Sequence, residues 1–576
     1  MKGNRPPLGN DEFFQTVLAV FFLALLALLV FAPLAELLAK AFSGGEDGLS
    51  GFDRFAGYLS DPGLRRSFWN SLWVSVISSS VACAAALLTA LSVCRTSMPG
   101  KPLARGLALL PLFAPTMMHG IALVYLFGNK GIVTALGWNI GLYGATGIVL
   151  GEILYVFPQA FLILSAALEI SDRRLYEAAE ILGAGQLRRF WTITLPGLRY
   201  ALLNAFFVGF TLSFTDFGAP KVVGGNFNVL ATDIYKQVIG QQNLSMGAVI
   251  GLLLLGPALA AFLAERGVSR LQGATLSSSS VPVKPSGNRL ANLLAVSWCT
   301  LAGGLSLAVV GAVLVAALVK TWPYNMSLTL DHFTFRNVAG YGFESYRNSL
   351  VVAALTAVFG TAAAFGGAYL VEKTRSPRPI RETARFLALL PLALPGLVIG
   401  LSYIFLFNRP VFEFPGGFAF ANPLNALYGT PWILVIANVV HFISVPFLTA
   451  VTAMRLLDPA FESVSASLGV PLFRTFRKVT LPLCLPVLLE IGSYFFVNAM
   501  VTISAVVFLY PPSFKPAALA IVNMEDAGDI APAAAMSVIL LVTNILVRLA
   551  YSVLTQRLRK KSQLWLGRER KAHAAS

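Results

Sequence analysis

Long apolar runs recur along this chain, and each is close in length to a membrane-spanning helix. One crossing of the hydrocarbon core needs roughly 20 residues at about 1.5 Å per residue. Twelve runs meet this requirement: 17–38, 72–93, 107–127, 147–167, 198–214 and 246–264 in the first half, and 293–319, 350–371, 386–407, 433–454, 486–508 and 533–549 in the second. The pattern predicts an all-α, polytopic membrane protein with about 12 transmembrane helices.

The composition agrees with this class and excludes a water-soluble globule. Of the 576 residues, 56% are hydrophobic and only 12% are charged, whereas soluble domains carry about 25% charged residues. The four cysteines are scattered without ligand spacing, so neither a disulfide nor a metal site is expected.

Basic residues are distributed unequally between alternate loops. If the N-terminus is cytoplasmic, the cytoplasmic segments hold 30 of the 43 Lys and Arg residues and the outer loops hold 11. This bias follows the positive-inside rule and predicts a membrane protein with both termini in the cytoplasm. The net charge of +16 then reflects topology and contact with the lipid bilayer. It calls for no nucleic-acid partner.

The chain contains two copies of one unit. Asn70-Ser71-Leu72 recurs as Asn348-Ser349-Leu350, and Leu107-Ala108-Leu109-Leu110-Pro111 recurs 280 residues later as Leu387-Ala388-Leu389-Leu390-Pro391. Between the copies lies a Ser-, Pro- and Gly-rich stretch typical of a linker. We therefore predict a six-helix repeat at 1–265, a cytoplasmic linker at 266–290, a second six-helix repeat at 291–550 and a basic tail at 551–576. Both halves enter the membrane from the same side, so the repeats are parallel.

The loop after the fourth run predicts a short, capped helix. Asp172 can accept hydrogen bonds from the free N–H groups of a helix beginning at Arg173, and Gly183 suits the left-handed residue beyond its end. An apolar stripe of small and branched residues follows at i, i+3, i+4 and i+7: Leu175, Ala178, Ala179 and Leu182. Another protein can approach this face closely because alanine is small.

The second half has a matching loop. It begins with Asp458-Pro459, a strong helix start. Gly469 precedes Pro482 by 13 residues, as Gly183 precedes Pro196.

Together these loops resemble the EAA signature of ABC importer permeases: Glu-Ala-Ala, three residues, Gly, nine residues and Ile-x-Leu-Pro. The first loop matches with Glu177, Ala178, Ala179, Gly183, Leu195 and Pro196. The second departs, because Ser463, Val464 and Ser465 occupy the Glu-Ala-Ala positions and Glu462 lies one residue early; Gly469, Leu481 and Pro482 remain. The resemblance implies a type I ABC importer permease fold (MetI-like) and assigns these residues to two coupling helices that insert into ATP-hydrolysing subunits.

The resemblance also implies the partners. A P-loop needs Gly-x-x-x-x-Gly-Lys-Ser/Thr, but the only Gly-Lys here, Gly100-Lys101, is followed by Pro102. We therefore expect a chain that is not an enzyme and holds no cofactor, with ATP and Mg bound by two partner ABC ATPase subunits. A periplasmic solute-binding protein is the other implied partner, and the bacterial inner membrane is the implied location.

The small-molecule substrate is suggested by one stretch. Residues 215–225, 231–235 and 241–243 resemble 2-aminoethylphosphonate permeases, while Thr215-Asp216-Phe217-Gly218 alone also occurs in ferric iron permeases. A phosphonate is the predicted substrate and ferric iron the alternative.

Ionisable residues within apolar runs are costly in a bilayer and mark candidate path positions. They are Glu152, Asp216, His441 and Glu490. The structural alternative for each is a hydrogen bond between neighbouring helices, which we favour for His441 and for His119.

A competing class is the secondary transporter driven by an ion gradient, which also often has twelve helices in two parallel halves. The loop around Glu177 argues against it.

Overall fold

The computed structural model describes residues 10–42, 51–275, 283, 285, 287–335, 342–374, 376–413, 419–458 and 460–573. Within these residues, eight helices are long and apolar enough to cross a membrane, or up to 12 if four bent helix pairs each count as one span. The all-α polytopic class predicted from the apolar runs is confirmed. Much of the linker lies outside the described residues, as do the side chains from residue 559 to the C-terminus.

Four of the predicted spans are broken rather than straight. The two sharpest bends, of 105° and 115°, separate Lys101–Phe113 from Thr116–Ala135 and Arg378–Ala393 from Gly396–Phe407. Each break contains a proline, Pro115 or Pro395, and proline disfavours helical backbone at the residue before it. The other two pairs bend by 55° between Phe442 and Ser444 and by 75° between Leu483 and Leu485.

The chain forms two compact units that do not follow the repeat boundaries. The repeat-1 unit comprises residues 40–343 and 517–541, and the repeat-2 unit comprises residues 1–39, 344–516 and 542–576. The opening helix of each repeat therefore packs in the unit of the other repeat. The repeat boundaries predicted at 1–265 and 291–550 describe the duplication of the sequence and not these compact units, so they stay a prediction.

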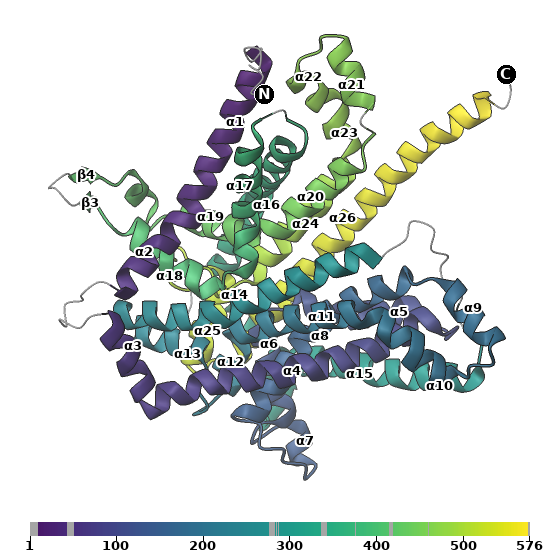
Figure 1. Cartoon of the computed structure of the whole chain (residues 1–576). Coiled ribbons are helices and arrows are strands. Elements are labelled where there is room, and N and C mark those ends of the chain that lie inside the picture. Colours follow the sequence, from purple (N-terminus) through teal and green to yellow (C-terminus); the bar gives the residue numbers. More distant parts are fainter. Residues whose placement is uncertain are drawn as a thin grey trace. The chain divides into compact units, whose positions relative to one another are not determined.

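The repeat-1 unit is a helical bundle in which α4, α8, α11, α14 and α15 pack together (Figure 1). Its helices are α3 (Gly51–Ser60), α4 (Pro62–Arg95), α5 (Lys101–Leu109), α6 (Thr116–Phe127), α7 (Ile132–Ala135), α8 (Ala145–Glu169), α9 (Arg173–Ile181), α10 (Gln186–Arg189), α11 (Leu195–Thr215), α12 (Gly218–Val223), α13 (Leu230–Tyr235), α14 (Leu244–Thr275), α15 (Arg289–Leu318) and α25 (Ala517–Asp526), with η2 (Leu110–Phe113), η3 (Phe190–Thr194), η4 (Lys236–Gly240) and η5 (Asp331–Thr334).

The core of this bundle depends on small side chains. The face of α4 that meets α8 and α11 is rich in buried serine and alanine, including Ser78, Ser79 and Ala82. A Cβ at Gly209 of α11 would lie 2.6 Å from Val156 of α8 and 3.4 Å from Ser79 of α4. Small residues allow close helix contact in membranes, where lipid and side chains are equally apolar.

The repeat-2 unit has the same kinds of elements. They are α1 (Asn10–Leu26), α2 (Ala32–Phe42), α16 (Phe343–Glu372), α17 (Arg378–Leu389), α18 (Gly396–Phe407), α19 (Pro431–Phe442), α20 (Ser444–Arg455), α21 (Ala460–Ser467), α22 (Leu472–Thr475), α23 (Leu481–Leu483), α24 (Leu485–Val501) and α26 (Ile530–His573), with η1 (Ala27–Phe31), η6 (Leu390–Ala393), η7 (Pro423–Leu427) and η8 (Phe476–Thr480). Helices α2 and α26 each cross a unit boundary. Helix α1 packs on α17, and Tyr403 of α18 donates a hydrogen bond to the Leu29 carbonyl at 2.8 Å.

Two short antiparallel hairpins accompany the helices and were not predicted. Strand β1 (Val319–Thr321) pairs with β2 (Asn325–Leu328), and β3 (Val411–Glu413) pairs with β4 (Ala419–Ala421). Each hairpin follows the end of an apolar helix, so they leave the predicted class unchanged.

Candidate coupling loops and translocation path

The first coupling loop folds as the sequence predicts. Helix α9 begins after Asp172, whose carboxylate accepts a hydrogen bond from the Arg174 N–H at 3.0 Å. Its end is closed by hydrogen bonds from the Gly183 and Ala184 N–H groups to the Glu180 and Ala179 carbonyls. Gly183 has φ +75°, a backbone conformation that glycine adopts without a Cβ penalty. The predicted cap and turn are confirmed, whereas the coupling role stays a prediction.

A tyrosine anchors this helix to the membrane-spanning bundle. The Tyr176 hydroxyl lies 2.9 Å from the Thr194 hydroxyl in η3, and the Arg95 guanidinium at the end of α4 lies over the Tyr176 ring at 5.1 Å from its centroid. These contacts hold α9 against the end of α4 and against η3, which leads directly into α11. The sequence interpretation missed Tyr176, although its place two residues before Ala178 puts it on the opposite side of the helix from that alanine.

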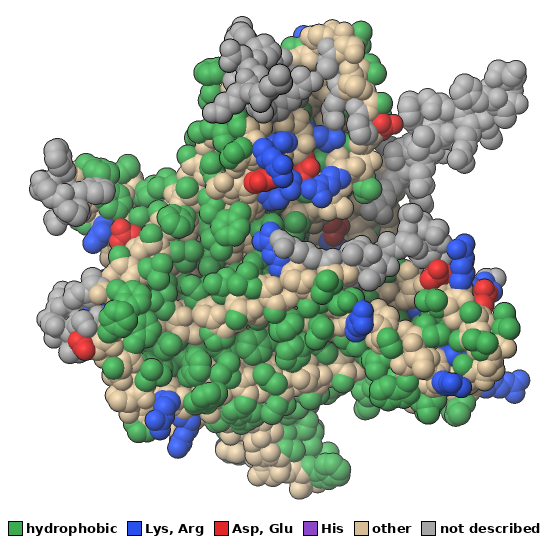
Figure 2. Space-filling view, viewed as in Figure 1, with side chains coloured by type: hydrophobic (Ala, Val, Ile, Leu, Met, Phe, Trp, Pro, Cys, Tyr) green, Lys and Arg blue, Asp and Glu red, His purple; other side chains and the backbone are tan. Residues whose placement is uncertain are grey.

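The outer face of α9 is apolar and uncovered. Ile181 and Leu182 are 87% and 83% exposed, and Leu187 just beyond them is 72% exposed. Figure 2 shows much hydrophobic side-chain surface on the molecule, as expected for the segments that lipid surrounds. Ile181 and Leu182 differ because they lie between the apolar spans Ala145–Glu169 and Gln186–Thr215.

Glu177 is paired within its own helix. Its carboxylate lies 2.6 Å from Nε of Arg173, one turn earlier, and the Glu177 side chain is 50% exposed. Arg189 similarly pairs with Glu180 at 3.1 Å. Exposed pairs of this kind contribute little, typically below about 1 kcal/mol, so Glu177 can exchange Arg173 for another basic partner at small cost.

The second coupling loop repeats this geometry. The Ala460 N–H donates to the Asp458 carboxylate at 2.8 Å, and Gly469 has φ +63°. Phe461, Val464 and Leu468 are 47%, 57% and 72% exposed. Each loop then enters a five-residue π-helix, η3 or η8, directly before its Leu-Pro pair, Leu195-Pro196 or Leu481-Pro482. The Glu462 side chain lies outside the described residues.

The structure brings two predicted path residues together in the repeat-1 unit. Glu152 of α8 is fully buried and lies beside Asp216, which follows α11. Ser213 is the other polar neighbour, yet neither Glu152 oxygen has a hydrogen-bond partner of ordinary geometry among the described residues. The Asp216 carboxylate accepts a hydrogen bond from the Ala219 N–H at 3.0 Å. Two adjacent buried carboxylates strongly disfavour carrying two negative charges.

The other predicted path residues belong to the repeat-2 unit. Glu490 of α24 forms an ion pair with Arg548 of α26 at 2.7 Å, which supports the helix-tying alternative. His441 packs edge-on against Phe442, with ring centroids 4.5 Å apart. His119 is 1% exposed and makes no hydrogen bond through its ring nitrogens to a described group. The helix-tying hydrogen bond favoured for His119 is therefore not seen.

An ion pair that the sequence interpretation missed joins parts of both repeats within the repeat-1 unit. Lys221 of α12 lies 2.5 Å from Asp526 at the end of α25 and over the Tyr235 ring at 5.4 Å. The pKa of the adjacent Glu525 is raised to about 6, chiefly by burial, while Lys221 lowers it and Asp526 raises it. A cavity of about 580 Å³ is lined by Lys221, Tyr235 and Asp526, and also by Lys236. No local sequence signal predicts this pair, because 305 residues separate its members.

Comparison with known proteins agrees with this architecture. The sequence profile of the family described as "Binding-protein-dependent transport system inner membrane component" matches residues 85–273 and 357–560. The ferric transport system permease protein FbpB of Actinobacillus pleuropneumoniae is 29% identical over 85% of this chain and 70% of its own length. A protein of Salmonella paratyphi A named for 2-aminoethylphosphonate transport, PhnV, is 25% identical over 43% of this chain and 89% of its own length. A bacterial alginate ABC transporter aligns with a TM-score of 0.38 at 17% identity, covering 46% of this chain and 97% of that one.

Two copies of one permease domain in a chain of apolar spans define the class, which is the membrane component of an ABC importer. The chain belongs to the family of binding-protein-dependent transport system inner membrane components, with both permease domains fused in one polypeptide. Proteins of this family are membrane transport components rather than enzymes, and the secondary-transporter alternative is excluded.

Proposed function

We propose that α9 and α21 each dock on an ATPase subunit and that the chain forms the import path for a solute delivered by a periplasmic binding protein. The observation that carries this proposal is the uncovered apolar face at Ile181 and Leu182, on a helix anchored through Tyr176. Apolar surface outside the lipid marks a protein contact. ATP hydrolysis by separate subunits follows from this arrangement, and the cytoplasmic placement of both loops follows from the positive-inside bias.

For the substrate, we propose ferric iron ahead of the phosphonate that the sequence run favoured. The similarity to FbpB extends over 85% of the chain. Fully buried Glu152 and partly buried Asp216 form a carboxylate pair, and carboxylate oxygens are preferred by hard cations. At the equivalent positions, 286 residues later, the second repeat has neutral Asn438 and Thr502. Only the first repeat would therefore offer carboxylates at these positions to a passing cation.

A phosphonate stays as the second candidate because of the basic residues beyond α12. Lys221 and Lys236 line one cavity, and ammonium groups suit an anionic substrate. The similarity to PhnV supports this candidate over a shorter stretch.

The test is uptake by proteoliposomes containing the full chain, its ATPase and its binding protein. Radioactive ferric iron and 2-aminoethylphosphonate are offered in parallel. We expect iron uptake, and we expect Glu152→Gln and Asp216→Asn each to lower it about tenfold or more, equivalent to about 1.4 kcal/mol. Glu344→Gln removes an exposed carboxylate on α16 and serves as the control. Phosphonate uptake without iron uptake would refute the iron proposal. If neither iron nor phosphonate stimulates ATP hydrolysis, both substrate proposals are contradicted.

A further inference from the structure

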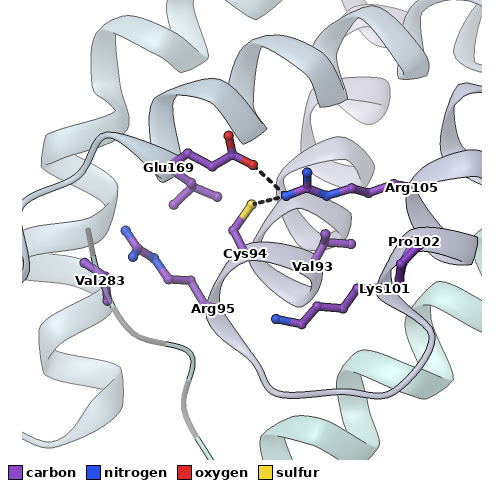
Figure 3. Close-up of a pocket in the computed structure, with 9 residues that line it drawn as sticks. Val93, Cys94, Arg95, Lys101, Pro102, Arg105, Glu169 and Val283 are labelled. Carbon is purple, nitrogen blue, oxygen red and sulfur yellow. Dashed lines mark hydrogen bonds and ion pairs between the residues drawn. The ribbon is translucent and has the colours of Figure 1, made fainter. Parts of the chain in front are cut away.

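Five polar residues surround a cavity where α4, α5 and α8 meet in the repeat-1 unit. The cavity has a volume of about 470 Å³, and its polar lining consists of Cys94, Arg95, Lys101, Arg105 and Glu169 (Figure 3). Three of these side chains are cations and one is a carboxylate. The spans α4 and α8 end at Arg95 and Glu169, so the cavity lies at the level where a bilayer presents its headgroups.

Only one of the three cations is neutralised by a carboxylate. Arg105 lies 2.5 Å from Glu169 and donates weakly to the Cys94 sulfur at 3.9 Å, and these are the contacts drawn in Figure 3. Arg95 stacks on a tyrosine ring, but its Nε and Nη2 atoms have no hydrogen-bond partner among the described residues. Lys101 forms no ion pair within the part of the chain that the structure describes. Two positive charges are left over in one cavity.

The corresponding residues of the second repeat show a different arrangement of charge. By the repeat offsets, Cys94 corresponds to Glu372, Arg105 to Arg385 and Glu169 to Arg455. There the Glu372 carboxylate is paired with Arg385 and lies 2.7 Å from Arg455. Each repeat thus has one carboxylate in this cluster, at the end of α8 in the first repeat and at the end of α16 in the second.

In the first repeat, the position that corresponds to Glu372 holds the neutral thiol of Cys94.

We propose that the cavity between Arg95, Lys101 and Arg105 binds an anion of the phosphate class. Guanidinium groups bind phosphate oxygens through paired, charge-assisted hydrogen bonds, and lysine adds a compact positive charge. The phosphate belongs either to an anionic lipid headgroup or to a free phosphate in solution; both have the same chemistry. Basic pockets between transmembrane helices are known to hold anionic headgroups.

The competing explanation is that these cations serve only to orient the chain in the membrane, which requires no ligand. Cys94→Glu distinguishes the two. It adds a carboxylate at the position where the second repeat has Glu372, so the cavity becomes less positive. A bound anion should be displaced by this change, whereas orientation should be unaffected.

The experiment uses the purified full chain in nanodiscs. In the first arm the discs contain only phosphatidylcholine, and inorganic phosphate is titrated by calorimetry. In the second arm phosphatidylglycerol is included, and retained lipid is counted by native mass spectrometry. Wild type should bind in one arm or both. Binding should weaken about tenfold or more in Arg95→Gln/Lys101→Gln and in Cys94→Glu, because charge-assisted hydrogen bonds are lost or a repulsive charge is added.

Two matched variants serve as controls. Cys94→Gln changes the side chain without adding charge and should retain binding. Arg477→Gln/Lys478→Gln removes two exposed cations from η8 and should also retain it. Binding only of phosphatidylglycerol assigns the site to lipid, and binding only of phosphate assigns it to a free anion. No binding in either arm, or equal binding by all well-folded variants, would overturn the proposal.

Discussion

One close contact occurs at equivalent positions in both repeats and joins a glycine to a hydroxyl-bearing residue. The glycine lies on one side of the contact in the first repeat and on the opposite side in the second. In the repeat-1 unit Thr116, the first residue of α6, faces Gly218, the first residue of α12. In the repeat-2 unit the equivalent positions are Gly396 and Ser504, and these also face each other. Each contact has one hydroxyl-bearing residue and one glycine. We expect that placing a side chain on both sides of one contact destabilises the protein.

The structure gives the size of the effect. A Cβ added at Gly218 would overlap the Thr116 hydroxyl and would lie 2.9 Å from the Met117 backbone nitrogen. Rotating Thr116 relieves the first overlap but not the second, so α6 or α12 must shift. Overpacking of this kind costs about 1–3 kcal/mol. Gly218→Ser should therefore lower stability by that amount. Thr116→Gly/Gly218→Ser should be more stable, by about 0.5 kcal/mol or more, than the sum of the single changes predicts, because it removes the overlap with the Thr116 side chain. The recovery is partial because the Met117 nitrogen stays close.

The assay is thermal unfolding of the purified full chain in one detergent, followed by intrinsic fluorescence, for the two single variants and the double variant. Gly106→Ser is the matched control, because a Cβ there meets no atom within 4 Å. If Gly218→Ser is as stable as Gly106→Ser, the contact is not close. If the double variant is no better than additive, the two residues do not compensate for each other.

Three further predictions concern the coupling loops and the topology. Gly183→Val should uncouple transport from ATP hydrolysis, because a β-branched residue resists φ +75°, while Gly185→Val at φ −64° should not; proteoliposome uptake measured beside ATPase activity decides, and wild-type uptake by the first variant would be contrary evidence. Glu177→Ala should weaken ATPase pull-down and uptake more than Glu462→Ala, since only the first glutamate has the expected register; a larger loss from the second would contradict this. A cysteine at Ser278, which lies outside the described residues, should resist impermeant reagents in spheroplasts, and labelling there would reverse the orientation.

Local sequence signals were sufficient to predict the membrane spans and the two short loop helices, α9 and α21. The length of an apolar run decides whether a helix can cross a bilayer, and that length is a property of contiguous residues. The caps at Asp172 and Asp458 and the left-handed glycines 183 and 469 involve partners only a few residues away. Their geometry was therefore predictable without knowledge of the fold.

The bends in the spans show what local sequence signals do not predict. Pro115 and Pro395 mark the two sharpest breaks, because proline disfavours helix at the preceding residue. Proline does not determine the angle, which depends on what the following helix packs against. The sequence interpretation accordingly placed straight spans at 107–127 and 386–407, where the structure has bends of 105° and 115°.

The sequence by itself determined the class of this protein, its duplication and the two loops, since these depend on composition, on repeated residues and on contacts within one turn. Only the tertiary structure decided which polar residues meet. Glu152 and Asp216 are 64 residues apart yet adjacent, Glu490 is paired with Arg548, and Lys221 is paired with Asp526. The same four kinds of charged side chain occur throughout the chain, so their identity does not specify a partner. Helix packing does, because it brings distant residues within the few ångströms over which hydrogen bonds and ion pairs form.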